Sequence, residues 1–175
     1  MDTSKVKNLS IASAVAMALG IPLDSSATGY LKIGDIKGES TETTEHKEWI
    51  NILSWSWGMS AGDRGKTCVQ DMSLLKKVDS ASDDLARSIP AGTVFPLAEL
   101  EITEGGGSAG GEEYVKMRYV MRNVKLTSLQ SSGGDGGLGA ESFSISFEEL
   151  EGFYKKDSTG RGDEQSFIIP GNECK

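Results

Sequence analysis

The chain contains a single histidine, His46, which a serine or cysteine nucleophile would need as its general base. This histidine lies in a polar stretch, Glu39–Glu48, that has no apolar periodicity and no nucleophile motif nearby. We therefore interpret His46 as a solvated loop residue. One histidine is also too few for a histidine-rich metal site. The sequence predicts no catalytic residue, no metal ligand and no bound cofactor.

Two glycine-rich segments, Gly105–Gly111 and Gly133–Gly139, contain the G-x-G-x-x-G pattern of dinucleotide sites. In such sites the pattern opens a helix whose N-terminus faces the phosphates. Here both segments lead into residues that alternate like strands, and Glu112 and Glu113 would repel a phosphate. We interpret both segments as connections between strands.

Carboxylates are abundant, and one interpretation of them is a pair of acids for glycosidic chemistry. The default interpretation is a solvated acidic face. The residues concerned are Glu42, Glu45, Glu48, Glu148, Glu149 and Glu151.

The two cysteines, Cys68 and Cys174, match neither a metal-ligand spacing nor a redox motif. Two free thiols are expected in a reducing compartment. A single long-range disulfide would require maturation outside the cytosol. The sequence leaves both states open.

Apolar and polar residues alternate in six segments, which predicts strands. One short helix is expected between them, capped by Ser80 or Ser82 and ended by Gly92. In the longest strand the apolar parity changes at Arg122, where we expect a bulge or a barrel corner. These features predict an all-β barrel or sandwich. The predicted strands are Tyr30–Ile36, Trp49–Trp57, Cys68–Val78, Val94–Thr103, Glu113–Leu129 and Ser142–Phe147.

Aromatic residues mark the expected core. Leu53, Trp55 and Trp57 share one face of a predicted strand, and Phe143 and Phe147 alternate with serines in another. Large aromatics carry the largest burial free energy per residue, so we expect these side chains to be buried. The tryptophan pair would also suit a subunit interface or a ligand-stacking surface.

The chain divides into an N-terminal extension (residues 1–28), a β domain (29–160) and a polar C-terminal tail (161–175). The extension contains an apolar run, Leu9–Ile21, that is too short to span a bilayer. We interpret it as a helix in preference to a secretory signal, because Asp2 does not suit a basic n-region.

The formal net charge of −8 argues against nucleic acid and against an anionic membrane surface as partners. Both of these partners require a basic face. We expect no nucleic-acid binding and no membrane insertion.

Several motifs occur in the order typical of one known family. Lys32–Ser40 reads Lys-Ile-x-x-Ile-Lys-Gly-Glu-Ser, His46 and Lys47 follow, and Leu53–Gly58 reads Leu-Ser-Trp-Ser-Trp-Gly. This order resembles the opening of the haemolysin-coregulated protein (Hcp) family, which forms the tube of type VI secretion systems. The likeness extends over Gly29–Tyr154. Its later pieces are Val69–Ser73, Lys77–Ser82, Glu113–Val124 and Glu141–Phe147.

The resemblance implies a small β-barrel of two packed antiparallel sheets with one short flanking helix. It also implies head-to-tail hexameric rings that stack into a tube carrying effectors, with the sheath and spike proteins as further partners. A subunit would reside in the bacterial cytoplasm before assembly and would then be secreted through the type VI machine.

The resemblance also assigns a role to the segment Gly58–Thr67, as the extended loop that contacts neighbouring subunits or rings. The segment reads as long and flexible. Met59 lies there beside Asp63, Arg64 and Lys66, a mixture of apolar and opposite charges that suits an interface with a polar rim.

Two departures from the family pattern leave alternatives open. The chain adds about 28 residues before Gly29, and the tail Glu164–Lys175 does not resemble the usual family ending. One alternative is an exported Hcp-like surface protein that uses residues 1–27 as a signal. Another is a small hydrolase built on this barrel.

Overall fold

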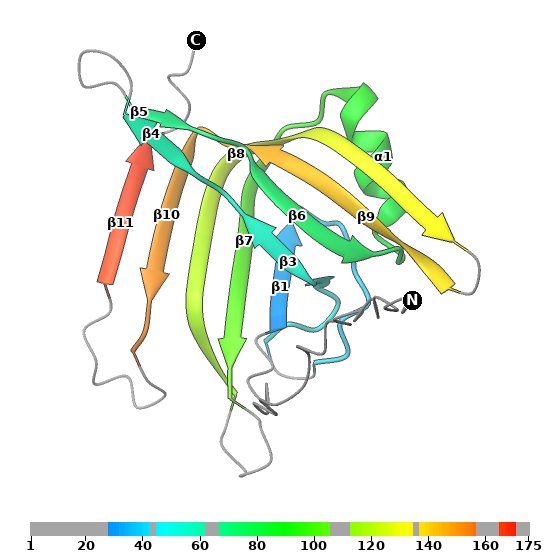
Figure 1. Ribbon diagram of the computed structural model, residues 1–175, viewed down its shortest axis with the longest axis horizontal. Coiled ribbons are helices and arrows are strands. Elements are labelled where there is room, and N and C mark those ends of the chain that lie inside the picture. Colours follow the sequence, from blue (N-terminus) through cyan, green and yellow to red (C-terminus); the bar gives the residue numbers. More distant parts are fainter. Residues whose placement is uncertain are drawn as a thin grey trace, which may run out of the picture.

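In a computed structural model of the chain, the residues described are 28–42, 45–61, 67–105, 113–134, 137–156 and 165–170. These residues form eleven strands and one helix (Figure 1). The strands are β1 (Thr28–Ile33), β2 (Ile50–Ile52), β3 (Ser54–Ser56), β4 (Met59–Ala61), β5 (Thr67–Val69), β6 (Met72–Lys77), β7 (Phe95–Glu104), β8 (Tyr114–Gly134), β9 (Gly137–Ser146), β10 (Glu149–Tyr154) and β11 (Gln165–Pro170), and the helix is α1 (Ser82–Ala91).

Two antiparallel sheets share strand β8, which is 21 residues long. The first half of β8 pairs with β7 and β10, in a sheet ordered β2-β1-β7-β8-β10-β11 that we call the first sheet. The second half pairs with β9, in a sheet ordered β8-β9-β6-β3 that we call the second sheet. The two sheets cross with helix α1 at their side (Figure 1), which confirms the predicted all-β barrel with one flanking helix.

The bend predicted near Arg122 is confirmed. Asn123 has a positive φ of 50°, a conformation that asparagine tolerates better than most residues. Its side-chain amide donates a hydrogen bond of 2.7 Å to Glu148, and the backbone N–H of Glu148 donates one of 3.0 Å to the Arg122 carbonyl. The strand therefore passes from one sheet to the other at the position where the apolar parity changes.

The single strand predicted at Trp49–Trp57 is in fact two. Strand β2 pairs with β1 in the first sheet and β3 pairs with β6 in the second, and Leu53 lies between them. The backbone N–H of Leu53 donates to the Leu75 carbonyl at 2.7 Å. In the sequence, Ile50 and Ile52 lie on the strand face opposite to that of Leu53, and this change of parity reflects the change of sheet between β2 and β3. Leu53 is 54% exposed, so its expected burial was wrong.

The core fills the space between the two sheets with side chains from alternate strand positions. Phe143 and Phe147 belong to it. Trp55 and Trp57 are partly buried and pack edge-on against Tyr119. The buried apolar residues are Leu31, Ile33, Ile50, Ile52, Val69, Met72, Leu74, Ala81, Leu85, Ala98, Leu100, Tyr119, Met121, Val124, Leu126, Phe143, Ile145, Phe147, Leu150 and Ile169.

Helix α1 begins differently from the prediction and ends as predicted. Its N-cap residue is Ala81, which makes no side-chain cap, so neither Ser80 nor Ser82 is the cap. Asp83 and Asp84 lie in the first turn, where the helix dipole favours negative charge. Gly92 ends the helix in the left-handed conformation.

A buried lysine fastens the helix to the second sheet. Lys76 has no exposed side-chain surface, and its ammonium lies 2.6 Å from Asp79 and 2.9 Å from Glu141. It also donates a hydrogen bond of 2.8 Å to the Lys77 carbonyl. The Ser82 hydroxyl donates to Glu141 at 2.6 Å. Every charge in this cluster therefore has an opposite partner, as a buried ion requires.

The expected polar tail supplies a strand. Strand β11 pairs with β10 over its whole length, and Ile169 is buried. Phe167 lies against Gly152, where a side chain on residue 152 would collide with its ring. Phe167 also lies 6.1 Å from the ring of Trp57. The second glycine segment is shorter than expected, because Gly134 already pairs with Gly137.

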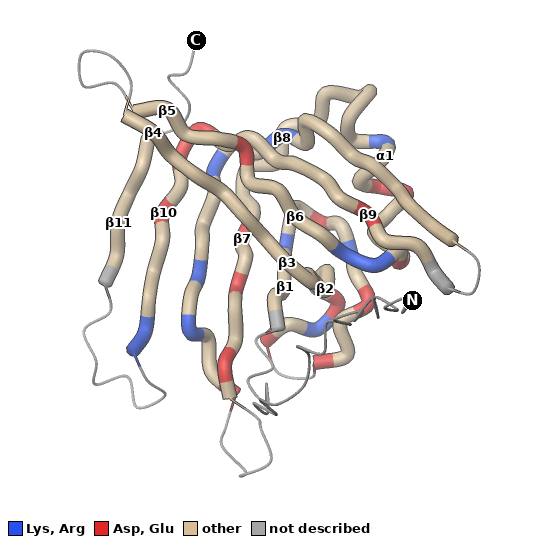
Figure 2. The backbone as a smooth tube through the Cα atoms, in the orientation of Figure 1, with Lys and Arg blue, Asp and Glu red and all other residues tan. Residues whose placement is uncertain are grey.

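Charges on the first sheet are arranged as opposites on neighbouring strands. Figure 2 shows acidic positions along β7 beside basic positions along β8. Arg118 lies 3.7 Å from Glu99, and Arg122 lies 2.9 Å from Glu149. Within the described residues, no helix is long and apolar enough to cross a membrane.

Candidate functional site

The segment expected to contact neighbouring subunits forms a short hairpin that we call the arm, composed of β4 and β5. Met59 pairs with Val69 and Ala61 with Thr67. Immediately outside the two strands, the backbone N–H of Gln70 donates a hydrogen bond of 2.8 Å to the Gly58 carbonyl. The segment was expected to be a long flexible loop, but its described part is paired backbone.

At the base of the arm, the paired residues Val69 and Met59 differ in exposure. Val69 is 2% exposed and belongs to the core, whereas Met59 is 58% exposed although it is apolar. An exposed methionine on paired backbone suits an interface. Asp63, Arg64 and Lys66, which were expected to contribute charges, lie outside the described residues.

Cys68 lies in the second strand of the arm and is disulfide-bonded. The chain has one other cysteine, Cys174, which lies outside the described residues. The thiol of Cys68 is therefore not free, which selects the disulfide from the two states that the sequence left open.

His46 is buried, although it was interpreted as a solvated loop residue. Only 4% of it is exposed. Its ring stacks on Tyr30 with centroids 4.2 Å apart, and it meets the edge of Trp49 at 5.0 Å. Its Nε2 lies 2.6 Å from a carboxylate oxygen of Glu101 on β7, and its Nδ1 lies 3.5 Å from Glu42. The histidine thus fastens its loop to the first sheet.

The carboxylates around His46 favour its protonated form. Burial lowers the pKa of His46, but the hydrogen bond to Glu101 and the charges of Glu101, Glu42 and Glu45 outweigh burial, so the pKa is raised. Because the pKa of His46 is higher in the folded than in the unfolded chain, its protonation stabilises the fold. This stabilisation is complete at pH values below the pKa of the unfolded chain. That contribution is lost as the pH rises through the folded-state pKa.

We predict that His46→Phe, which keeps an aromatic ring on Tyr30, lowers the free energy of unfolding more at pH 6 than at pH 9. At pH 6 the loss should be about 1.5–3 kcal/mol, the range for hydrogen bonds to charged groups. Urea unfolding of both proteins at the two pH values measures this. An equal loss at both values would mean that His46 carries no charge in the fold.

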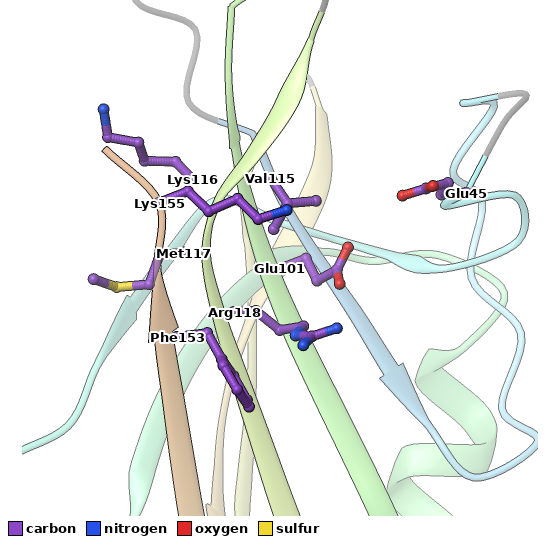
Figure 3. Close-up of a pocket in the computed structure, with 8 residues that line it drawn as sticks. All are labelled: Glu45, Glu101, Val115, Lys116, Met117, Arg118, Phe153 and Lys155. Carbon is purple, nitrogen blue, oxygen red and sulfur yellow. The ribbon is translucent and has the colours of Figure 1, made fainter. Parts of the chain in front are cut away.

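Two adjoining polar cavities lie beside this histidine. The first, of about 310 Å³, is shown in Figure 3. Glu101 and Arg118 extend into it from paired positions on β7 and β8. The second, of about 320 Å³, shares Glu45 and Lys155 with the first and adjoins His46. Their residues come from three separate segments, 42–46, 101–118 and 153–155, so no local motif predicts them.

Two cations of the first cavity interact with groups of the same chain. The ammonium of Lys116 lies 2.6 Å from Glu104 and hydrogen-bonds to the Tyr114 hydroxyl at 3.2 Å. The guanidinium of Arg118 lies over the Phe153 ring at 4.5 Å. The hydrogen bond from Lys116 lowers the pKa of Glu104. These contacts stabilise the sheet face.

Polar groups from the described parts of the two cavities interact with one another. The two ring nitrogens of His46 face the carboxylates of Glu101 and Glu42. The hydroxyl of Thr103, which lines the second cavity, donates to Glu113. In the part of the chain that the structure describes, no group of three or more metal-ligating side chains comes together.

The family model for the type VI secretion system effector Hcp matches residues 30–154. A curated relative, protein hcp1 of Pseudomonas aeruginosa, is 36% identical over 137 residues, which cover 72% of this chain and 82% of that protein. The family match runs from within β1 to the end of β10 and includes the helix. It ends before β11, which is therefore an addition to the matched region.

Solved structures share the fold. The crystal structure of Hcp1 from Salmonella typhimurium has a TM-score of 0.69 at 24% identity, covering 82% of this chain and 94% of that one. A structure described as a type six secretion system protein has a TM-score of 0.68 at 28% identity, covering 81% and 92%. A type VI secretion system effector from Yersinia pestis has a TM-score of 0.69 at 20% identity, covering 81% and 98%.

Proposed function

This chain belongs to the Hcp family of type VI secretion proteins, and from that premise we propose that it is a ring-forming subunit of a stacked secretion tube. The family assignment makes it a structural, secreted protein. We propose that about six copies form a ring, that rings stack head to tail, and that the tube carries effectors. The observation that carries the proposal is a family match extending over the whole barrel.

Unpaired strand edges support association. Among the described strands, β3 pairs only with β6, and β11 pairs only with β10. An exposed strand edge is a template for another chain and must be covered or otherwise protected. A head-to-tail interface that closes into a ring would cover such edges.

The arm supports stacking or contact between neighbours. It combines the buried side chain of Val69 with the exposed apolar side chain of Met59, and the family resemblance assigns its inter-subunit loop to this segment. We propose that Gly58 and Met59, together with Asp63, Arg64 and Lys66, contact another subunit or ring.

We propose that the protein acts without catalysis. The side chain of His46 is engaged by carboxylates, as described above. We also propose that the protein resides in the bacterial cytoplasm before assembly and meets sheath, spike and effector proteins there, as the family resemblance implies. The disulfide of Cys68 would then form after secretion, because thiols stay reduced in the cytosol.

The arm proposal predicts that Met59→Glu disrupts assembly. Burying a methionine contributes about 1.5–3 kcal/mol, so its loss should weaken each contact about 10- to 100-fold. Native mass spectrometry of the full chain at micromolar concentration measures the assembled fraction. The control is Val94→Glu, which changes a similarly exposed apolar residue outside the arm.

The outcomes separate the two parts of the proposal. Wild-type and Val94→Glu proteins should form rings, and Met59→Glu should lose rings or stacks. Unchanged rings and stacks in Met59→Glu would exclude Met59 from the contacts. A monomeric wild-type protein would contradict the tube function itself.

A further inference from the structure

An apolar hollow of about 240 Å³ lies at the start of strand β1. Gly29 pairs with Ile52 on one side and with Ile102 on the other. Gly29 has no side chain, so its backbone lies close to Ile52. The residues that line the hollow are Gly29, Ile52, Leu53, Ser54, Trp55 and Ile102.

The rim of the hollow is apolar and partly exposed. Leu53 is 54% exposed, and Trp55 is half-buried. The Trp55 Nε1 is buried, and no residue in the described part of the chain accepts a hydrogen bond from it. A buried donor without an acceptor is costly, and tryptophan usually pairs this group. Among the described residues, the rim therefore has both uncovered apolar surface and a donor without an acceptor.

The chain enters the fold beside this hollow. Strand β1 begins at Thr28, next to Gly29, which lines the hollow. In the sequence, 27 residues precede this strand. They contain the apolar run Leu9–Ile21 and then Leu23. Leu23 precedes Thr28 by five residues, which can span up to about 17 Å. Apolar side chains in a soluble chain gain free energy by leaving water.

We propose that the apolar part of the N-terminal extension docks into this hollow and covers Leu53 and Trp55. The hollow then accommodates apolar side chains from residues 9–23 of the same chain. The family match begins at residue 30, so the extension would add an intramolecular plug to the matched barrel.

A second copy of the chain is the competing occupant. Its exposed Met59 could also fill an apolar hollow. The tether favours the chain's own segment, because a short flexible linker gives an effective concentration in the millimolar range. A second copy of the chain would compete for the hollow only at its concentration in solution, which is micromolar in these experiments.

The test is photo-crosslinking from the rim in the full chain that begins at Met1. The photoreactive residue p-benzoylphenylalanine replaces Leu53, whose exposed side chain tolerates the change. The control replaces Val94, which precedes β7 while Ile102 lies near the end of that strand. Eight residues of strand separate these positions by about 26 Å. Peptide mapping identifies the cross-linked partners.

Mixed samples of ¹⁴N- and ¹⁵N-labelled protein distinguish the occupants. The proposal expects single-isotope cross-links from position 53 to peptides containing residues 9–23, at least tenfold above the control. Mixed-isotope cross-links as the main product would overturn it in favour of a second copy. Yields equal to the control would also overturn it.

A second variant tests the role of the apolar segment. Ile21→Asp combined with Leu23→Asp should reduce these cross-links at least fivefold, whereas Lys5→Asp should leave them unchanged. Unchanged cross-links in the double variant would overturn docking by the apolar run. The inference does not depend on ring formation.

Discussion

Lys76→Met is expected to lower the free energy of unfolding by about 3–5 kcal/mol, because removing one partner of a buried ion cluster leaves uncompensated charge. Methionine keeps most of the side-chain volume, so the change isolates the charge. Asp79 and Glu141 would lose an ammonium at 2.6 Å and 2.9 Å respectively. Urea unfolding monitored by circular dichroism measures the loss.

The matched control is Lys116→Met. Lys116 also lies 2.6 Å from a carboxylate, that of Glu104, but both side chains are partly exposed. Pairs at the surface contribute about 0–1 kcal/mol. Equal effects of the two substitutions would contradict the assignment of Lys76 to a buried, fully paired cluster.

The same cluster gives a pH dependence at the acid end. Burial raises the pKa of Glu141, but the hydrogen bonds from Ser82 and Lys76 and the charge of Lys76 lower it more, so the pKa is lowered overall. A lowered pKa stabilises the fold above the pKa of the unfolded chain. This stabilisation is lost as the pH falls through the folded-state value.

Phe143→Ala is expected to cost about 3–5 kcal/mol, the range for truncating a buried aromatic ring. Phe143 has no exposed surface and lies where β9 pairs with both β6 and β8. The free energy of unfolding in urea measures the cost.

Val94→Ala serves as the comparison for this truncation. The side chain of Val94 is 47% exposed and lies away from the core, so its loss should change stability by about 0.5 kcal/mol or less. If Val94→Ala cost as much as Phe143→Ala, the loss would not report burial, and the placement of Phe143 in the core would be contradicted.

Local periodicity made much of the barrel predictable. The change of parity at Arg122 predicted the corner at Asn123, because side chains on a strand must alternate between core and solvent. The same kind of signal occurs at Leu53, where the sequence is compatible with a bulge or with burial on both faces. Periodicity alone does not distinguish a bulge from a change of sheet, because both move the next residue to the other face.

The features missed by sequence analysis depend on distant partners. His46 is buried because Tyr30 and Glu101 surround it, and Glu101 is 55 positions away. The only apolar signal for strand β11 in the sequence is the short run Phe167–Ile169, and the strand forms by pairing with β10. A signal did exist for Lys76, because it shares the inward face of its strand with Met72 and Leu74.

Electron microscopy of the purified full chain tests the tube function most directly. The family assignment and the exposed arm predict rings of about six subunits that stack on their common axis into tubes. A homogeneous population of monomers at micromolar concentration, without rings or stacks, would contradict the function proposed here.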